Sequence, residues 1–164
     1  MRKKLVAGSS AVALIAALGC AVSIAAAAGP SQSVVGSGWR GNVDDPTTPV
    51  HHFAVNAHSG PQGVSGTYRL SSPNPLLNFS GQVTCLAVVG DQAVVGGIVT
   101  SGGEPGEIGT GFAVGFIDEG PASDKQTFTD VEIATPVDCA SEQFLFTLTL
   151  FPVLNGNVVV DHAP

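Results

Sequence analysis

From Val50 to the end of the chain, short apolar runs alternate with clusters of Gly, Pro, Asn, Asp and Ser. Such runs, each bounded by turn residues, are typical of β-strands joined by tight turns. No stretch of this part of the sequence keeps the 3.6-residue period that an amphipathic helix requires. The pattern therefore predicts a single antiparallel, all-β domain over residues 50–164.

The number and order of the strands indicate the architecture. About eight strands are expected, because each apolar run is closed by its own turn signal. Sequential hairpins favour a meander that closes into a small barrel, since closure removes exposed edges; a two-sheet β-sandwich is the alternative. In the last hairpin we expect residues 144–150 to form a strand and Asn155-Gly156 to form a type I′ turn.

The N-terminus has the features of an export signal. Arg2, Lys3 and Lys4 precede a run of apolar and small residues that ends in Ala26-Ala27-Ala28. A basic start, an apolar stretch and a small-residue cleavage site define a secretory signal peptide, here residues 1–28. We expect a secreted, extracellular protein with no transmembrane span after cleavage, in which residues 29–49 form a linker or an edge segment.

The three cysteines fit this reading. Cys20 lies in the signal segment, where Leu18-Gly19-Cys20 partly matches a lipoprotein box. The alternative is therefore a cell-envelope lipoprotein with a lipid anchor at Cys20. Cys85 and Cys139 remain as an even pair in an oxidising compartment, which predicts one disulfide.

Charge excludes some partners. The chain has a formal net charge of −7, with 6 Lys and Arg against 13 Asp and Glu. Removing residues 1–28 leaves Arg40, Arg69 and Lys125, and three basic residues minus thirteen acidic ones gives −10. Such a surface lacks the cations that nucleic-acid binding requires, so no nucleic-acid partner is expected.

Metal-ligating residues are few and scattered. His52 and His58 lie six positions apart, so on a regular strand they share a face but are separated by about 20 Å. Asp118 and Asp124 flank an acidic loop with oxygens that would suit Ca²⁺, although the loop lacks the usual calcium-binding spacing. These four residues are weak metal candidates, the prediction is that no metal or cofactor is bound, and strand ends and a solvated turn explain the residues equally well.

Several segments resemble a known family. They are 52–57 (HFAVNA), 66–68 (GTY), 79–90 (FSGQVTCLAVVG), 93–98 (AVVGGI) and 155–161 (NGNVVVD). Together they resemble a family of uncharacterised secreted proteins, mostly from actinobacteria, described as post-COAP-1-type domains, and the V-T-C-L motif is the most distinctive part. The resemblance implies an exported β domain and supplies no catalytic residues.

Catalytic motifs are absent from the sequence. It contains no G-x-S-x-G nucleophile elbow, no H-E-x-x-H helix and no phosphate-binding loop. We therefore expect no enzyme and no catalytic residue, but an exported β module with a binding or cell-envelope accessory role. One alternative is a small barrel that carries an apolar ligand; another is a metal-assisted hydrolase that uses His52 or His58.

Overall fold

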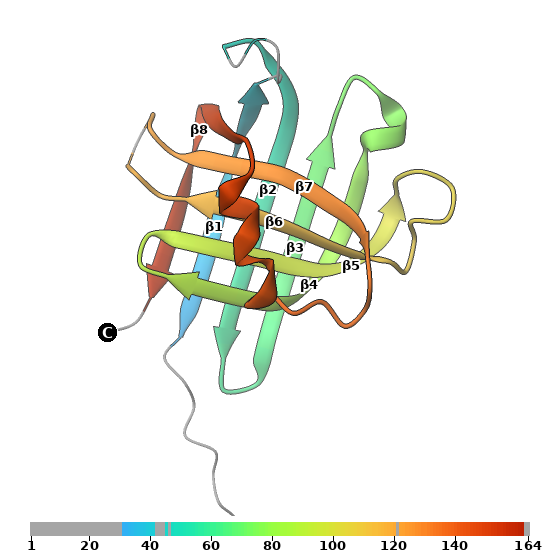
Figure 1. The fold of residues 1–164 in the computed structure, drawn as a ribbon, viewed down its shortest axis with the longest axis vertical. Helices are drawn as coiled ribbons and strands as arrows, with labels where there is room; N and C mark the ends of the chain where they lie inside the picture. The colour runs from blue at the N-terminus through green and yellow to red at the C-terminus, as the bar shows by residue number, and fades with distance from the viewer. Residues whose placement is uncertain (1–30, 42–44, 46, 121, 163–164) are drawn as a thin grey trace, which may run out of the picture.

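Eight antiparallel strands follow one another around a closed barrel in the order in which they occur along the chain (Figure 1). This computed structural model describes residues 31–41, 45, 47–120 and 122–162. The predicted meander barrel is confirmed, and the sandwich alternative is wrong because β8 returns to pair with β1. The elements are β1 (Gln32–Gly41), β2 (Pro49–Gly60), β3 (Gly63–Ser71), the 3-10 helix η1 (Pro75–Leu77), β4 (Phe79–Val89), β5 (Gln92–Gly102), β6 (Gly111–Ile117), β7 (Lys125–Ile133), the 3-10 helix η2 (Ser141–Thr147) and β8 (Leu150–His162).

Strand β1 corrects the predicted start of the domain. We expected residues 29–49 to be a linker or an edge segment, but Gln32–Gly41 pairs with β2 on one side and with β8 on the other. The face of β1 that carries the core residue Val34 continues through two glycines to the buried Arg40. Because those glycines stand where a buried strand usually has apolar side chains, the alternation that reveals a strand is missing from the sequence. The domain therefore begins at β1 and not at Val50.

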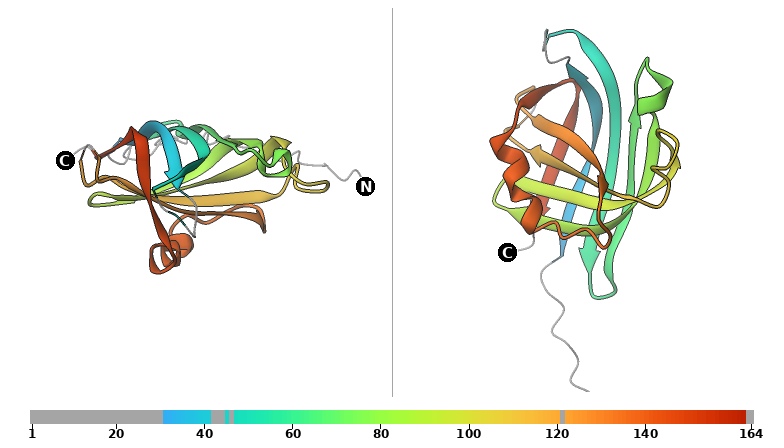
Figure 2. Two further views of the ribbon diagram at one scale, coloured as in Figure 1. Left: turned by 90° about the horizontal axis from the view of Figure 1, so that it is seen from above. Right: turned by 45° about the vertical axis from the view of Figure 1, so that its right-hand side comes forward.

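The segment after β7 also differs from the prediction. The expected strand over residues 144–150 is mostly the 3-10 helix η2, which lies on the outside of the barrel across β6 (Figures 1 and 2). Leu145 is its buried residue, while Phe144 and Leu148 are exposed. A 3-10 helix has three residues per turn, so the alternate Phe and Leu residues do not share one face as they would on a strand.

The expected turn at Asn155-Gly156 lies inside β8. Asn155 has a positive φ of 50°, as a type I′ turn would require, but the chain does not reverse there. The pairing of β1 with β8 instead shifts register between Ser37 and Trp39. The local Asn-Gly signal therefore marks a bulge, which bends one long strand around the barrel.

Aromatic side chains fill the barrel interior. Tyr68 and Phe112 stack with ring centroids 5.5 Å apart, and Phe53 and Phe116 lie 5.6 Å apart. Phe79 packs against both Tyr68 and Phe112. All five are buried in one hydrophobic cluster, so side chains of the described residues fill the centre of the barrel.

A smaller cluster packs on the outside of β5 and β6, and the predicted disulfide holds it. Cys85 on β4 is bonded to Cys139, which lies just before η2. Gly96 is the close neighbour of this bond, because a Cβ at that position would meet the Cys85 sulfur at 2.8 Å. A larger residue at position 96 would therefore collide with the disulfide.

The described residues contain no helix long and apolar enough to cross a membrane. The predicted signal peptide, 1–28, and the lipidation candidate Cys20 lie outside the described residues.

Candidate functional site

One end of the barrel forms a mouth around an arginine. At this end lie the last residues of β1, β3, β5 and β7 and the first residues of β2, β4, β6 and β8. Arg40, near the end of β1, points into this mouth and is only 3% exposed. A buried arginine is costly unless its charge is balanced by a partner, so its surroundings decide what the site can do.

Two aromatic rings and one carbonyl hold the Arg40 side chain. Its guanidinium carbon lies 4.9 Å from the ring centre of Phe128 and 4.8 Å from that of Phe151, both within the range of a cation–π interaction. Nη1 donates to the Thr127 carbonyl at 3.3 Å, and Nε has no partner in the described structure. The guanidinium is therefore held in place with hydrogen-bonding capacity left over.

No carboxylate neutralises Arg40 within the described parts of the chain. Lys125 and Glu119 form the one ion pair found there. Burial lowers the pKa of Arg40, while the nearby Tyr68 hydroxyl acts in the opposite direction. An arginine stays protonated at neutral pH even so, which leaves a buried positive charge at the mouth.

His51 lies beside Arg40, since the two residues are paired across β1 and β2. Its Nδ1 atom is buried and without a partner among the described residues. Burial, and then the charge of Arg40, lower the pKa of His51 below its usual value of 6.5. The imidazole is therefore neutral at pH 7 and offers a second, uncharged polar group to the mouth.

A polar network lies deeper in the barrel. Tyr68 Oη and Thr129 Oγ1 are 2.9 Å apart, and Gln126 Nε2 donates to Tyr68 Oη at 3.0 Å. Gln126 Oε1 is buried and unpartnered in the described structure. Burial raises the pKa of Tyr68, so this network is neutral and contributes no counter-charge to Arg40.

A cavity of about 160 Å³ opens at the mouth. Apolar side chains form most of its wall, with Arg40, His51, Glu107 and Thr129 as the polar exceptions; the apolar residues are Leu70, Leu76, Leu77, Phe79, Phe128 and Val131. Glu107 is the one acid in this lining, and its Oε2 accepts a hydrogen bond from the Glu104 amide at 2.9 Å. An apolar cavity of roughly this size holds a benzene-sized molecule.

The four metal candidates are not gathered into one site. His52 packs edge-on against Trp39 on the outside of the barrel, and His58 lies six residues further along β2, beside the β2–β3 turn. Across the described residues, no three His, Cys, Asp or Glu side chains come together in a geometry suited to a metal.

Asp118 and Asp124 have a structural role. Asp124 Oδ2 accepts from the Val158 amide at 2.7 Å, and Asp118 Oδ2 accepts from the Val160 amide at 3.0 Å. Strand β7 pairs with β8 only between Lys125–Thr127 and Leu150–Pro152. The two carboxylates therefore replace hydrogen bonds that β7 does not supply further along β8.

Arg40 was not among the candidate site residues predicted from the sequence. Two weak features of the sequence pointed to it. Arg40 is one of only three basic residues after residue 28, and it follows Val34 at an even spacing. Even spacing puts both side chains on the same face of a strand. The residue could have been found only if β1 had first been recognised as a strand.

Comparisons with family models, with curated proteins and with solved structures return no match for this chain. The resemblance to the secreted actinobacterial family therefore stays a prediction.

Proposed function

We propose that this protein is an exported, non-enzymatic binding module that takes a small apolar carboxylate at the barrel mouth. The observation that carries the proposal is Arg40, a buried cation with no carboxylate partner in the described structure, at the wall of an apolar cavity. A ligand carboxylate would supply the missing charge, and its apolar body would cover the leucines and phenylalanines.

We expect the carried ligand at the barrel mouth and not in the barrel centre. The aromatic cluster occupies the interior, whereas the mouth cavity is bounded by the exposed Leu76 and Leu77 of η1 and is open to entry. The signal peptide predicted for residues 1–28 and the disulfide Cys85–Cys139 support an extracellular setting for such a module.

Benzoate and benzamide are the probes that test this function. They have nearly the same shape, but only benzoate is charged at pH 7. Calorimetric titration is expected to show benzoate binding at least tenfold more tightly than benzamide, because a charge-assisted hydrogen bond contributes about 1.5–3 kcal/mol. Arg40→Met is expected to remove that preference, and Glu107→Gln to strengthen benzoate binding by removing a like charge.

Two controls make the test decisive. Arg40→Met should melt no lower than wild type, because replacing a buried charge by an apolar side chain of similar size is often neutral or stabilising. Asp44 lies outside the described residues, so the variant Asp44→Asn tests whether the Asp44 carboxylate neutralises Arg40. This variant is expected to bind benzoate as wild type does. Equal binding of the two probes, absence of benzoate binding, or a large gain in Asp44→Asn would each overturn the proposal.

A further inference from the structure

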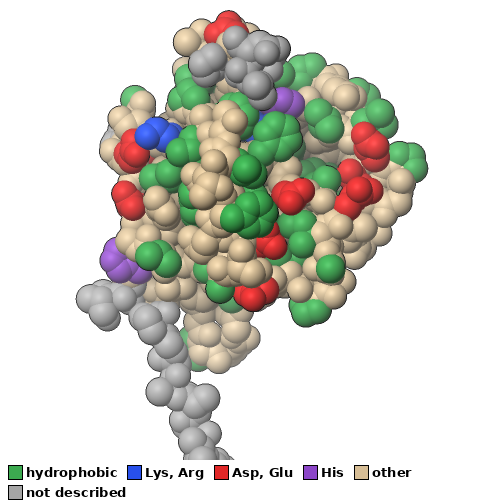
Figure 3. All heavy atoms as spheres, in the orientation of Figure 1, with side chains coloured by type: hydrophobic (Ala, Val, Ile, Leu, Met, Phe, Trp, Pro, Cys, Tyr) green, Lys and Arg blue, Asp and Glu red, His purple; other side chains and the backbone are tan. Residues whose placement is uncertain are grey.

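The outer face of the first five strands differs in charge from the rest of the molecule. Strands β1 to β5 contain no Asp or Glu, although the chain has 13 such residues. The carboxylates lie in the connections, in β7 and in β8, and Figure 3 shows acidic side chains spread over the face that carries η2. The outer faces of these five strands therefore contribute no acidic side chain, although η2, which carries Glu142, packs over part of β5.

Two neighbouring rows of side chains cross this surface. Trp39, His52 and Ser71 are register partners on β1, β2 and β3. Arg69, Ser80 and Ser101 are register partners on β3, β4 and β5. Trp39 is 38% exposed. Strand spacings put the Cα atoms of Trp39 and Arg69 about 12 Å apart, and both side chains lie on the same face of the sheet.

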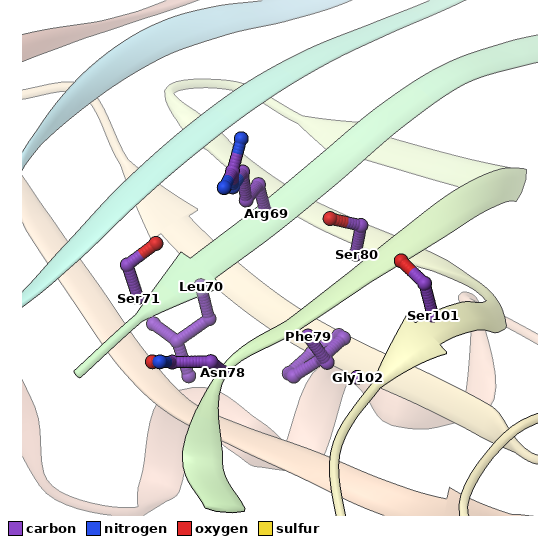
Figure 4. A pocket seen from close by; sticks show the side chains of 8 residues that line it. All are labelled: Arg69, Leu70, Ser71, Asn78, Phe79, Ser80, Ser101 and Gly102. Atoms are coloured by element: carbon purple, nitrogen blue, oxygen red, sulfur yellow. The ribbon is translucent and has the colours of Figure 1, made fainter. Parts of the chain in front are cut away.

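The surface is hollowed along these rows. A hollow of about 210 Å³ is lined by Trp39, Ser71, Ser72 and Pro73. A second hollow, of about 230 Å³, includes Arg69, Ser80 and Ser101 and shares Ser71 with the first. Figure 4 shows Arg69, Ser71, Ser80 and Ser101 projecting from one side of the sheet, whereas Leu70 and Phe79 point to the other. We call the two joined hollows the outer groove.

The side chains of the outer groove have the chemistry that an acidic sugar chain requires. The C–H face of a sugar ring packs on an aromatic ring such as Trp39, whose large surface has few rotatable bonds to immobilise. The serine hydroxyls both donate and accept hydrogen bonds, as sugar hydroxyls do. Arg69 has no carboxylate within 4 Å among the described residues, and its guanidinium suits a uronic acid carboxylate.

We propose that the outer groove binds a carboxylate-bearing polysaccharide, with a sugar ring on Trp39 and a carboxylate on Arg69. The absence of acids from β1 to β5 lets such a polymer approach one side of a protein that otherwise repels it. The groove side chains Trp39 and Arg69 lie on the outside of the barrel, whereas Arg40 points into the mouth, so separate variants test the two proposals.

The test uses polygalacturonate and alginate as acidic probes and dextran as a neutral one, in affinity electrophoresis and calorimetry at low salt. The purified protein is expected to be retarded by both acidic polymers and not by dextran. Trp39→Ala and Arg69→Gln are each expected to weaken binding about tenfold, the loss typical of a central aromatic or arginine contact.

Matched control variants distinguish binding by the groove side chains from the general effect of losing any cation or any exposed aromatic ring. Lys125→Gln removes a cation elsewhere on the surface, and Phe144→Ala removes an exposed aromatic ring from η2; both are expected to bind as wild type does. Arg40→Met is expected to leave polysaccharide binding unchanged even if benzoate binding is lost. The proposal is overturned if neither acidic polymer binds, if dextran binds equally well, or if the control variants lose as much affinity as Trp39→Ala and Arg69→Gln.

Discussion

At the residue scale, the barrel mouth combines two basic side chains whose pKa values are both lowered by burial but whose charges differ at neutral pH. Arg40 keeps its charge because the intrinsic pKa of a guanidinium is far above 7, and two rings and a carbonyl hold it in place. His51, its neighbour across the strands, stays neutral because burial and that same charge disfavour a second cation. The pair therefore holds one positive charge at neutral pH. When the pH is lowered, His51 is the member of the pair that takes up a proton.

His51 makes the free energy of unfolding depend on pH in the mildly acidic range. Its pKa is lowered in the folded protein, so below about pH 6.5 the unfolded chain binds a proton that the folded chain does not. The contribution of this residue is intact above pH 6.5 and is lost as the pH falls toward the lowered value. Urea unfolding at pH 7.5 and 5.5 is expected to show a smaller loss of stability for His51→Gln than for wild type. An equal loss in both proteins would contradict this role.

At the element scale, β8 is joined to its two neighbours unequally. It pairs with β1 along nearly its whole length and with β7 over only three residues. Beyond that short ladder, Asp118 and Asp124 accept hydrogen bonds from the amides of Val160 and Val158. Two side chains thus complete the closure of the barrel where the backbone of β7 diverges.

Asp124 is expected to be the more important of the two, since it is 1% exposed and makes the shorter bond. Asp124→Ala would leave the Val158 amide unpaired in a buried site, at a cost of about 1.5–3 kcal/mol. Urea unfolding measures that loss, and hydrogen exchange should show faster exchange at Val158. Asp124→Asn keeps an acceptor oxygen and should lose less; a loss as large as that of Asp124→Ala would assign the effect to charge rather than to the hydrogen bond.

At the scale of the whole molecule, the disulfide connects two parts of the chain that are 54 residues apart. It fixes the segment before η2 to β4, next to the buried cluster that contains Val94 and Leu145. Since η2 lies outside the closed sheet, the bond is the covalent link that holds this layer on the barrel.

Replacing both cysteines by alanine is expected to lower the free energy of unfolding by about 4 kcal/mol, the loop-closure entropy for a loop of this length. Denaturant unfolding measures the difference, with the Cys85→Ala, Cys139→Ala double variant compared with the oxidised wild type. Wild type under reducing conditions is the control and should approach the stability of the variant. A double variant as stable as the oxidised protein would show that η2 is held by packing alone.

The sequence predicted the barrel because most strands carry their own apolar alternation and their own turns. It failed for β1, where glycines replace inward apolar residues, and for η2, where alternating Phe and Leu residues imitate a strand. It also identified Cys85 and Cys139 but not Arg40, because the residues around Arg40 come from segments far apart in the sequence that meet only when the barrel closes. Local patterns cannot report which strand ends meet at a mouth.

Barrel closure also has an electrical consequence. Arg40 and Arg69 lie on β1 and β3, whereas the carboxylates lie outside β1 to β5. A rigid barrel keeps these charges at fixed positions, so the molecule has a permanent dipole moment as well as a negative net charge. Near a polyanionic surface the field turns the acid-free side inward before any contact forms, and added salt weakens that alignment.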